Sequence, residues 1–284
     1  MSLRIFSFGD IHNDTTSLGN VISFINDAAS QNKCDIVVQT GDWCSSVATS
    51  EELTDLRNNY LNNLTVPWFA VPGNHDISNS QCADGCLDHV GTPISCYYRT
   101  INGDPDWIRT FSKEGITYQL IGVSICFDPL TLYTLYWIFD FTQLNLSKTL
   151  PTILMNHGPI VIPEDTSCGS WTDNTLYAVE QNLKGQMDLL NILISYTGHA
   201  HASRQTIISN RLYITENTIS ESNERCTVDS TRFIGYTKIT PINNTFVTEY
   251  QIIRYENTNG TVPPFVDPFP DEECTTPITS FTID

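Results

Sequence analysis

The sequence predicts a single α/β domain built on mixed β-sheets, and three observations support this. Apolar patterns typical of strands and of helices alternate along the first part of the 284-residue chain. Four strand-like segments then follow one another. Five predicted strands end in turns that carry Asp, Asn or His, and ligand sites in open α/β sheets gather beyond the carboxyl ends of strands.

The first part of the chain alternates strand and helix patterns. Leu18–Ala29 has apolar residues at helical spacing. Thr49 and Glu52 have the spacing of a capping box, which predicts a helix from there to about Asn62. The alternating or β-branched segments that predict strands are Leu3–Phe8, Asp35–Thr40 and Val66–Val71.

The rest of the chain is assigned in the same way. Ile77 to about Trp107 has no period, which predicts a long loop. Strands are predicted at Ile116–Cys126, Pro151–Met155 and Ile192–Tyr196, and helices at Phe141–Leu150 and Leu176–Leu190. Consecutive antiparallel strands are predicted at Thr206–Ile208, Arg211–Thr215, Phe233–Ile239 and Phe246–Tyr255. The domain is placed at residues 1–256, and the Pro-rich acidic segment 257–284 is expected to be an extended C-terminal tail.

The charge balance disfavours several classes of partner. The chain has 14 Lys+Arg and 32 Asp+Glu, a formal net charge of -18. Such a surface repels polyanions, so nucleic acids and anionic membranes are not expected partners. No run of about 18 apolar residues occurs, so no membrane span is expected. A small phosphorylated substrate is compatible with this charge where local cations offset it. Composition makes no prediction of the oligomeric state.

Cysteines and sequons favour an oxidising compartment. Cys82 and Cys86 share one polar loop and Cys96 follows shortly after, which suggests disulfides. Asn-x-Ser/Thr sequons occur at Asn13, Asn63, Asn145, Asn243 and Asn259. A secreted or lumenal location is therefore favoured over a cytoplasmic one.

Histidines at the strand ends predict a metal site. Asp10 with His12, taken alone, also fits a capped turn before the first helix. His199-x-His201 is the strongest single pattern, because two imidazoles on one face form a natural chelating pair for a transition metal. Five of the six histidines follow predicted strands in this way, and we reject five independent coincidences. His89 is the exception and is expected on the surface.

The ordered set of motifs resembles the full signature of calcineurin-like metallophosphoesterases, from about residue 4 to 202. The motifs are Gly-Asp10-x-His12, Gly-Asp42, Gly-Asn74-His75-Asp76, His157 and Gly-His199-x-His201. The resemblance implies a four-layer sandwich, with two mixed β-sheets packed face to face and helices outside. It also implies two transition-metal ions, with Fe, Zn or Mn favoured. One would be held by Asp10, His12, Asp42 and His201, and the other by Asp42, Asn74, His157 and His199.

This resemblance also implies a mechanism. Asp42 would bridge the two ions together with a hydroxide that attacks phosphorus. His75 would face the substrate and protonate the leaving oxygen or stabilise the phosphate charge. Asp76 would orient the ring of His75.

Departures from particular subfamilies narrow the expected function. Ser45 stands where purple acid phosphatases carry a metal-binding tyrosine. Asp76 replaces the Glu of calcineurin-group protein phosphatases, and the first arginine after it is Arg99. The pattern is more similar to the branch of cyclic-nucleotide phosphodiesterases and phosphomonoesterases, and the Cys-bearing loop resembles acid-sphingomyelinase-like enzymes. The expected function is hydrolysis of phosphate monoesters or diesters, with cyclic-nucleotide or sphingomyelin-type diesters as the alternative. A nuclease is disfavoured by the charge, and a non-catalytic scaffold by the complete ligand set.

Overall fold

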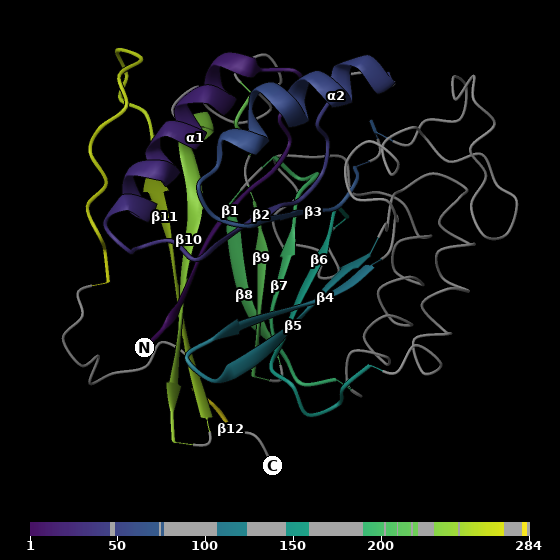
Figure 1. The fold of residues 1–284 in the computed structure, drawn as a ribbon, viewed down its shortest axis with the longest axis vertical. Helices are drawn as coiled ribbons and strands as arrows, with labels where there is room; N and C mark the ends of the chain where they lie inside the picture. Colours follow the sequence, from purple (N-terminus) through teal and green to yellow (C-terminus); the bar gives the residue numbers. More distant parts are fainter. Residues whose placement is uncertain are drawn as a thin grey trace, which may run out of the picture.

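The protein forms an α/β sandwich of two mixed β-sheets (Figure 1). The structure is a computed structural model. It describes residues 1–45, 49–73, 75–76, 107–123, 146–158, 190–201, 203–208, 210–216, 218–220, 230–243, 245–269 and 280–282. Within these residues each sheet has six strands.

The first sheet joins the two ends of the chain. Its strand order is β12 (Ser280–Thr282), β11 (Thr245–Arg254), β10 (Phe233–Ile242), β1 (Leu3–Phe8), β2 (Ile36–Gln39) and β3 (Trp68–Ala70). Strands β1, β2 and β3 are parallel, whereas β10 is antiparallel to both β1 and β11, and β11 is antiparallel to β12.

The second sheet is formed by the middle of the chain. Its order is β4 (Trp107–Lys113), β5 (Ile116–Val123), β6 (Thr152–Asn156), β7 (Ile192–Thr197), β9 (Arg211–Thr215) and β8 (Arg204–Ile208). Strands β5, β6, β7 and β9 are parallel, and the outer strands β4 and β8 are antiparallel to their neighbours.

Two α-helices pack on the first sheet. Helix α1 (Thr15–Ser30) begins at Asp14, whose side chain accepts a hydrogen bond from the Ser17 amide. Helix α2 (Ser50–Asn59) begins with the predicted capping box of Thr49 and Glu52. Figure 1 shows both helices on the same side of the sandwich. Short 3₁₀ helices occur at Leu61–Asn63 and Ser230–Arg232.

Strand β1 is buried on both faces, and this explains why all six of its residues are inaccessible. Leu3 and Ile5 point between the sheets, toward residues such as Tyr196 of β7. Phe6 and Phe8 point the other way and pack under α1. The two cores hold the sheets in place, so the loops after β1 and β2 meet those after β6 and β7.

Several predicted elements differ from the structure. The four consecutive strands predicted after residue 203 all occur, but not as one continuous run. They form two antiparallel hairpins, β8–β9 and β10–β11, in different sheets. Strand β4 follows the predicted loop and was not foreseen. Residues 146–150 are not helical, in contrast to the end of the predicted helix Phe141–Leu150. The predicted helix Leu176–Leu190 lies outside the described residues except for Leu190, and the loop from Ile77 lies outside them as far as residue 106.

The described part of the C-terminal segment packs against the domain. Residues 257–269 have no helix or strand, but Phe265 and Phe269 are buried in the core beneath α1. Asp267 accepts a hydrogen bond from Arg4. The division at residue 256 therefore stays a prediction about domain organisation.

No helix of the described residues is long and apolar enough to cross a membrane. Within the same residues, Cys34 and Cys44 are buried free thiols. Cys82, Cys86 and Cys96, on which the disulfide prediction rests, lie outside the described part of the chain, as does His89.

Candidate metal centre

Four strand-end loops converge at one end of the sandwich. The loop after β1 is bound to the loop after β2, because the Asp10 amide donates to the Gly41 carbonyl at 2.9 Å and the Ile11 amide donates to the Asp42 carbonyl at 2.7 Å. The loops after β6 and β7 are joined by the Gly198 amide, which donates to the His157 carbonyl at 2.8 Å.

A further contact links the two pairs of loops. The His199 amide donates to both carboxylate oxygens of Asp10, at 3.2 and 3.1 Å. The loop after β7, in the second sheet, is therefore bound to the loop after β1, in the first.

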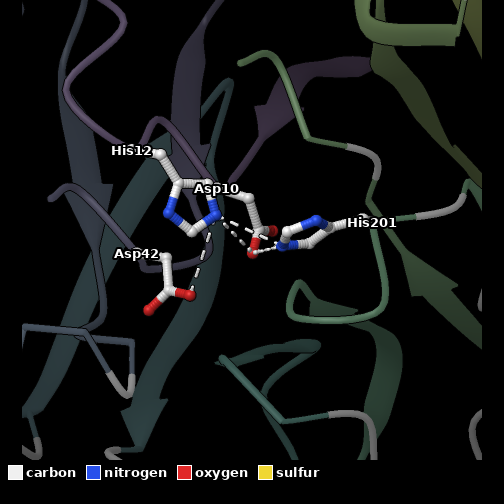
Figure 2. Close-up of side chains that lie close together, drawn as sticks. All are labelled: Asp10, His12, Asp42 and His201. Carbon is white, nitrogen blue, oxygen red and sulfur yellow. Dashed lines mark hydrogen bonds and ion pairs between the residues drawn. The ribbon is translucent and has the colours of Figure 1, made fainter. Parts of the chain in front are cut away.

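The first group of ligand atoms lies around the Nε2 atom of His12 (Figure 2). This nitrogen is 3.2 Å from Nε2 of His201, 3.9 Å from Oδ1 of Asp10 and 4.0 Å from Oδ2 of Asp42. His201 Nε2 is also 3.2 Å from Oδ1 of Asp10. All four residues are buried, so these polar atoms face one another and not solvent.

The second group shares Asp42 with the first. Oδ2 of Asp42 is 3.3 Å from Nε2 of His157, which is itself 3.2 Å from Nδ1 of His199. The Nδ1 atom of His157 donates to the Thr40 carbonyl at 2.8 Å, and this bond fixes the ring with Nε2 directed at Asp42.

The carboxylates and imidazoles shift one another's pKa values. Burial opposes ionisation of Asp42, but the charge of His157 and its hydrogen bond outweigh burial and hold the Asp42 pKa below its usual range. Burial likewise opposes charging of His157, yet Asp42 raises the His157 pKa to about 9. Burial and the neighbouring His157 lower the pKa of His199 to about 3, so this ring is a neutral nitrogen donor.

Backbone strain is concentrated in the same residues. Ten non-glycine residues of the described chain have positive φ, and five of them are Asp10, His12, Asp42, His199 and His201, with φ between 50° and 65°. Non-glycine residues adopt this left-handed conformation at a cost of about 1–3 kcal/mol, and such strain gathers at functional sites. Space is also restricted, because a Cβ on Gly73 would lie 2.0 Å from Oδ1 of Asp42.

His75 lies at the rim of these two groups. Its amide donates to Oδ1 of Asp42 at 2.9 Å, and its Nε2 is 3.8 Å from Oδ2 of Asp42. Its side chain is 39% exposed, and the ring packs edge-on against His12. His75 therefore has access to a bound molecule.

Asp76 contacts the loop backbones and not the ring of His75. One oxygen of its carboxylate accepts from the Trp43 and Cys44 amides at 3.0 and 3.3 Å, and the other accepts from the Gly73 amide at 2.8 Å. The predicted catalytic role in orienting His75 is corrected accordingly: Asp76 holds the loop after β2 against the loop after β3. Burial, with the charge of Asp42, raises the Asp76 pKa to about 8.

Six of the seven predicted metal ligands come together. They form two groups, Asp10, His12, Asp42 and His201, and Asp42, His157 and His199, in which the ligand atoms lie within 4.8 Å of one another. We call these six residues the ligand cluster. Its imidazole nitrogens and carboxylate oxygens are donors that suit transition metals, and their burial together fits a bound cation. Asn74, the seventh, lies outside the described residues.

The sequence did not indicate two supporting residues. The backbone carbonyl of Thr40 orients His157. Every residue has such a carbonyl, so the sequence does not mark it. The Thr218 hydroxyl donates to the Asp10 carbonyl at 2.8 Å from a strand-like bridge to Gly9. Thr218 follows β9, so a search of every strand end for polar residues would have found it.

The chain belongs to the calcineurin-like phosphoesterase family, which matches residues 3–203. This confirms the resemblance stated from the motifs. A comparison with curated proteins found no match.

Solved structures share the fold. GAP50, described as the anchor in the inner membrane complex of Plasmodium, is 16% identical with a TM-score of 0.60, covering 88% of this chain and 84% of that one. A candidate 5′-nucleotidase from Staphylococcus aureus is 14% identical with a TM-score of 0.53, covering 93% of this chain and 56% of that one. A dimetal phosphatase from Danio rerio is 14% identical with a TM-score of 0.49, covering 89% and 99%. At these identities the two structures with TM-scores above 0.5 show the fold alone.

Proposed function

We propose that this protein is a dinuclear metal-dependent hydrolase of phosphate esters. The observation that carries the proposal is the position of Asp42, whose carboxylate belongs to both groups of the ligand cluster. Two neighbouring cations repel each other, and a shared carboxylate offsets that repulsion. A site for one ion would not need a second group of buried imidazoles beyond Asp42.

The ligand cluster divides between the two ions. Asp10, His12, Asp42 and His201 would hold one, and Asp42, His157 and His199, with Asn74, the other. This donor set accommodates Fe, Zn or Mn. When bound, such ions act as Lewis acids toward phosphate oxygens and lower the pKa of water.

The residues of the chain prepare the cluster for this chemistry. Asp42 favours protonation of His157 at Nε2. Nε2 is also the atom through which His157 would bind a cation, so this proton has to leave when metal binds. Metal binding is therefore expected to release protons and to tighten as the pH rises. His75 is partly exposed beside Asp42, where it could donate a proton to the leaving oxygen or bind a phosphate oxygen.

The proposed substrates are small phosphate monoesters or diesters. The formal charge of -18 disfavours nucleic acids, and cyclic-nucleotide or sphingomyelin-type diesters remain the alternative substrates. Hydrolysis rates for p-nitrophenyl phosphate, bis-p-nitrophenyl phosphate, nucleotides and cyclic nucleotides would rank these classes.

Metal content and turnover of wild type and Asp42→Asn test the proposal together. Wild type should bind two equivalents of Mn²⁺ or Zn²⁺, and Asp42→Asn should lose metal and reduce turnover on the order of 10²–10³-fold. Asp35→Asn is the matched control, because Asp35 pairs with Lys113 away from the ligand cluster. A wild-type protein without metal, or full activity in Asp42→Asn, would contradict the proposal.

A second candidate function is that of a non-catalytic anchor. The similarity to GAP50, named as an anchor, favours it. The ligand cluster argues for catalysis instead, because an anchor has no use for six converging ligands. A protein that binds two ions but shows no turnover on the whole substrate panel would favour the anchor.

A further inference from the structure

Gln39, the last residue of β2, binds its neighbour Gly41 through both atoms of its side-chain amide. Nε2 of Gln39 donates to the Gly41 carbonyl at 2.8 Å, and Oε1 accepts from the Gly41 amide at 3.1 Å. Gln39 is 1% exposed, so water does not compete for these bonds. Both polar groups of Gly41 are thus held by one side chain.

Gly41 is the turn that directs Asp42. Its φ of +103° is a conformation that other residues rarely adopt, and a Cβ there would lie 2.7 Å from Nδ1 of His157. The Gly41 carbonyl also accepts from the Asp10 amide at 2.9 Å. Gly41 therefore connects Gln39 to the loops that carry Asp10 and Asp42.

The geometry points to Gln39 as a positioning residue for the shared carboxylate of Asp42. Holding the amide and the carbonyl of Gly41 together fixes both backbone dihedrals of that residue, and these set the direction in which Asp42 leaves the strand. Without Gln39, the buried Gly41 amide would lack this acceptor, and the turn could relax. This inference rests on the proposed function, because it gives Gln39 its effect through the metal ions that Asp42 would share.

Gln119 of β5 provides a matched control for a purely structural role. Its amide makes the same kind of double contact, accepting from the Ser147 amide at 3.1 Å and donating to the Ser147 carbonyl at 3.2 Å. Gln119 is 3% exposed and pairs in the sheet with Thr152, the first residue of β6. His157 of the ligand cluster follows the other end of that strand, so Gln119 lies away from the cluster. Gln119 also donates to the Thr152 hydroxyl at 3.1 Å. The two glutamines thus share the double contact with one backbone residue and differ in their distance from the metal site.

The experiment compares Gln39→Met with Gln119→Met. Methionine keeps the length of the side chain and removes the hydrogen bonds of the amide. Thermal unfolding of the metal-stripped proteins measures the structural cost, and calorimetric titration with Mn²⁺ measures the affinity. We expect both variants to unfold at lower temperature, and only Gln39→Met to bind Mn²⁺ about 10–100-fold more weakly, the size typical of residues that orient ligands.

Gln39→Asn is the second variant and keeps the test open if Gln39→Met does not fold. Asn carries the same amide on a side chain that is one methylene shorter, so it cannot make both contacts with Gly41 at once. We expect Gln39→Asn to bind Mn²⁺ more weakly than wild type, and Gln119→Asn to bind it as wild type does.

The outcomes separate this inference from the proposed function. If wild type binds Mn²⁺ and Gln39→Met binds it as tightly as Gln119→Met, the positioning role is wrong and the proposed function stands. Equal Mn²⁺ affinities of Gln39→Asn and Gln119→Asn also contradict it. If wild type binds neither Mn²⁺ nor Zn²⁺, both fail.

Discussion

Two groups of charged residues in this protein, one buried and one partly buried, are neutralised in different ways. In the ligand cluster, the described side chains that pair with Asp10 and Asp42 are imidazoles. In a second group, which we call the Arg4 cluster (Arg4, Lys33, Tyr236 and Asp267), the carboxylate of Asp267 is paired with an arginine and a lysine. Arg4 also donates to the Tyr236 hydroxyl at 2.9 Å.

The difference shows what each group is suited to do. Arg4 carries a permanent charge, so the Arg4 cluster is complete within the chain and serves to hold the C-terminal segment. Imidazoles can give up their protons near neutral pH, so the ligand cluster can exchange protons for metal ions. A permanent cation next to Asp42 would have closed the site to metal.

Glu216, which follows β9, shows a third way to bury an acid. Its carboxyl group accepts from the hydroxyls of Ser7 at 2.5 Å and Tyr250 at 3.4 Å, with no basic side chain among these partners. Burial raises the pKa of Glu216 to about 8. This acid therefore keeps its proton at neutral pH, in contrast to both clusters.

The largest expected effect on stability is that of replacing Glu216 by glutamine. Its pKa is about 8 in the folded protein and 4.5 in a model peptide, so the unfolded chain loses this proton first and wild type loses stability as the pH rises from about 4.5 to about 8. Glu216→Gln removes this slope and should gain about 4 kcal/mol relative to wild type across that range. Urea unfolding at several pH values measures the difference, and a constant difference would show that Glu216 is ionised when folded.

Arg4→Met should have the next largest effect. Removing one partner of a fully buried ion pair costs about 3–5 kcal/mol. Asp267 is partly exposed and Lys33 remains to pair with it, so we expect a loss at the lower end of this range, about 3 kcal/mol. The denaturation midpoint of metal-stripped protein measures this loss. Affinity for Mn²⁺ should not change, because Arg4 lies at the opposite end of β1 from the ligand cluster. A weakened Mn²⁺ affinity would mean that the two clusters are coupled.

Metal binding should stabilise the protein through the ligand cluster alone. Free Mn²⁺ at 100 times its Kd should raise the free energy of unfolding by about 2.7 kcal/mol in wild type and equally in Arg4→Met. Asp42→Asn should show little of this gain. Thermal unfolding with and without chelator measures this gain. If metal stabilises Asp42→Asn as much as wild type, the ligand cluster is not the metal site.

The smallest effect is expected for Lys33→Met. The Lys33 side chain is 20% exposed and lies 3.1 Å from Asp267, so solvent weakens the pair. We expect a loss below about 1 kcal/mol, which added salt should reduce further. A loss as large as that of Arg4→Met would show that Lys33, and not Arg4, supports the Arg4 cluster.

Local chemistry made part of this structure predictable. The capping box of Thr49 and Glu52 forms because its partners are three residues apart. The ligands could be found because each follows a strand with its own apolar pattern. Strand β4 was missed because it is an outer strand with several exposed residues. Exposed positions need no apolar side chain, so its sequence alternates only weakly between apolar and polar residues.

Contacts between distant segments were not predictable in the same way. Asp76 was expected to act on its neighbour His75. Its carboxylate instead accepts hydrogen bonds from the Trp43, Cys44 and Gly73 amides, which the fold brings to it. The burial of Phe265 and Phe269 depends on α1, more than 200 residues earlier in the chain.

The sequence by itself determined which side chains stand at the strand ends and which ions their nitrogens and oxygens suit, because ligand chemistry belongs to each residue. The three-dimensional arrangement alone placed the hairpins β8–β9 and β10–β11 in separate sheets and put Asp42 between two groups of imidazoles. Those outcomes depend on long-range packing of strands, whose apolar patterns say that each is buried but not against which partner.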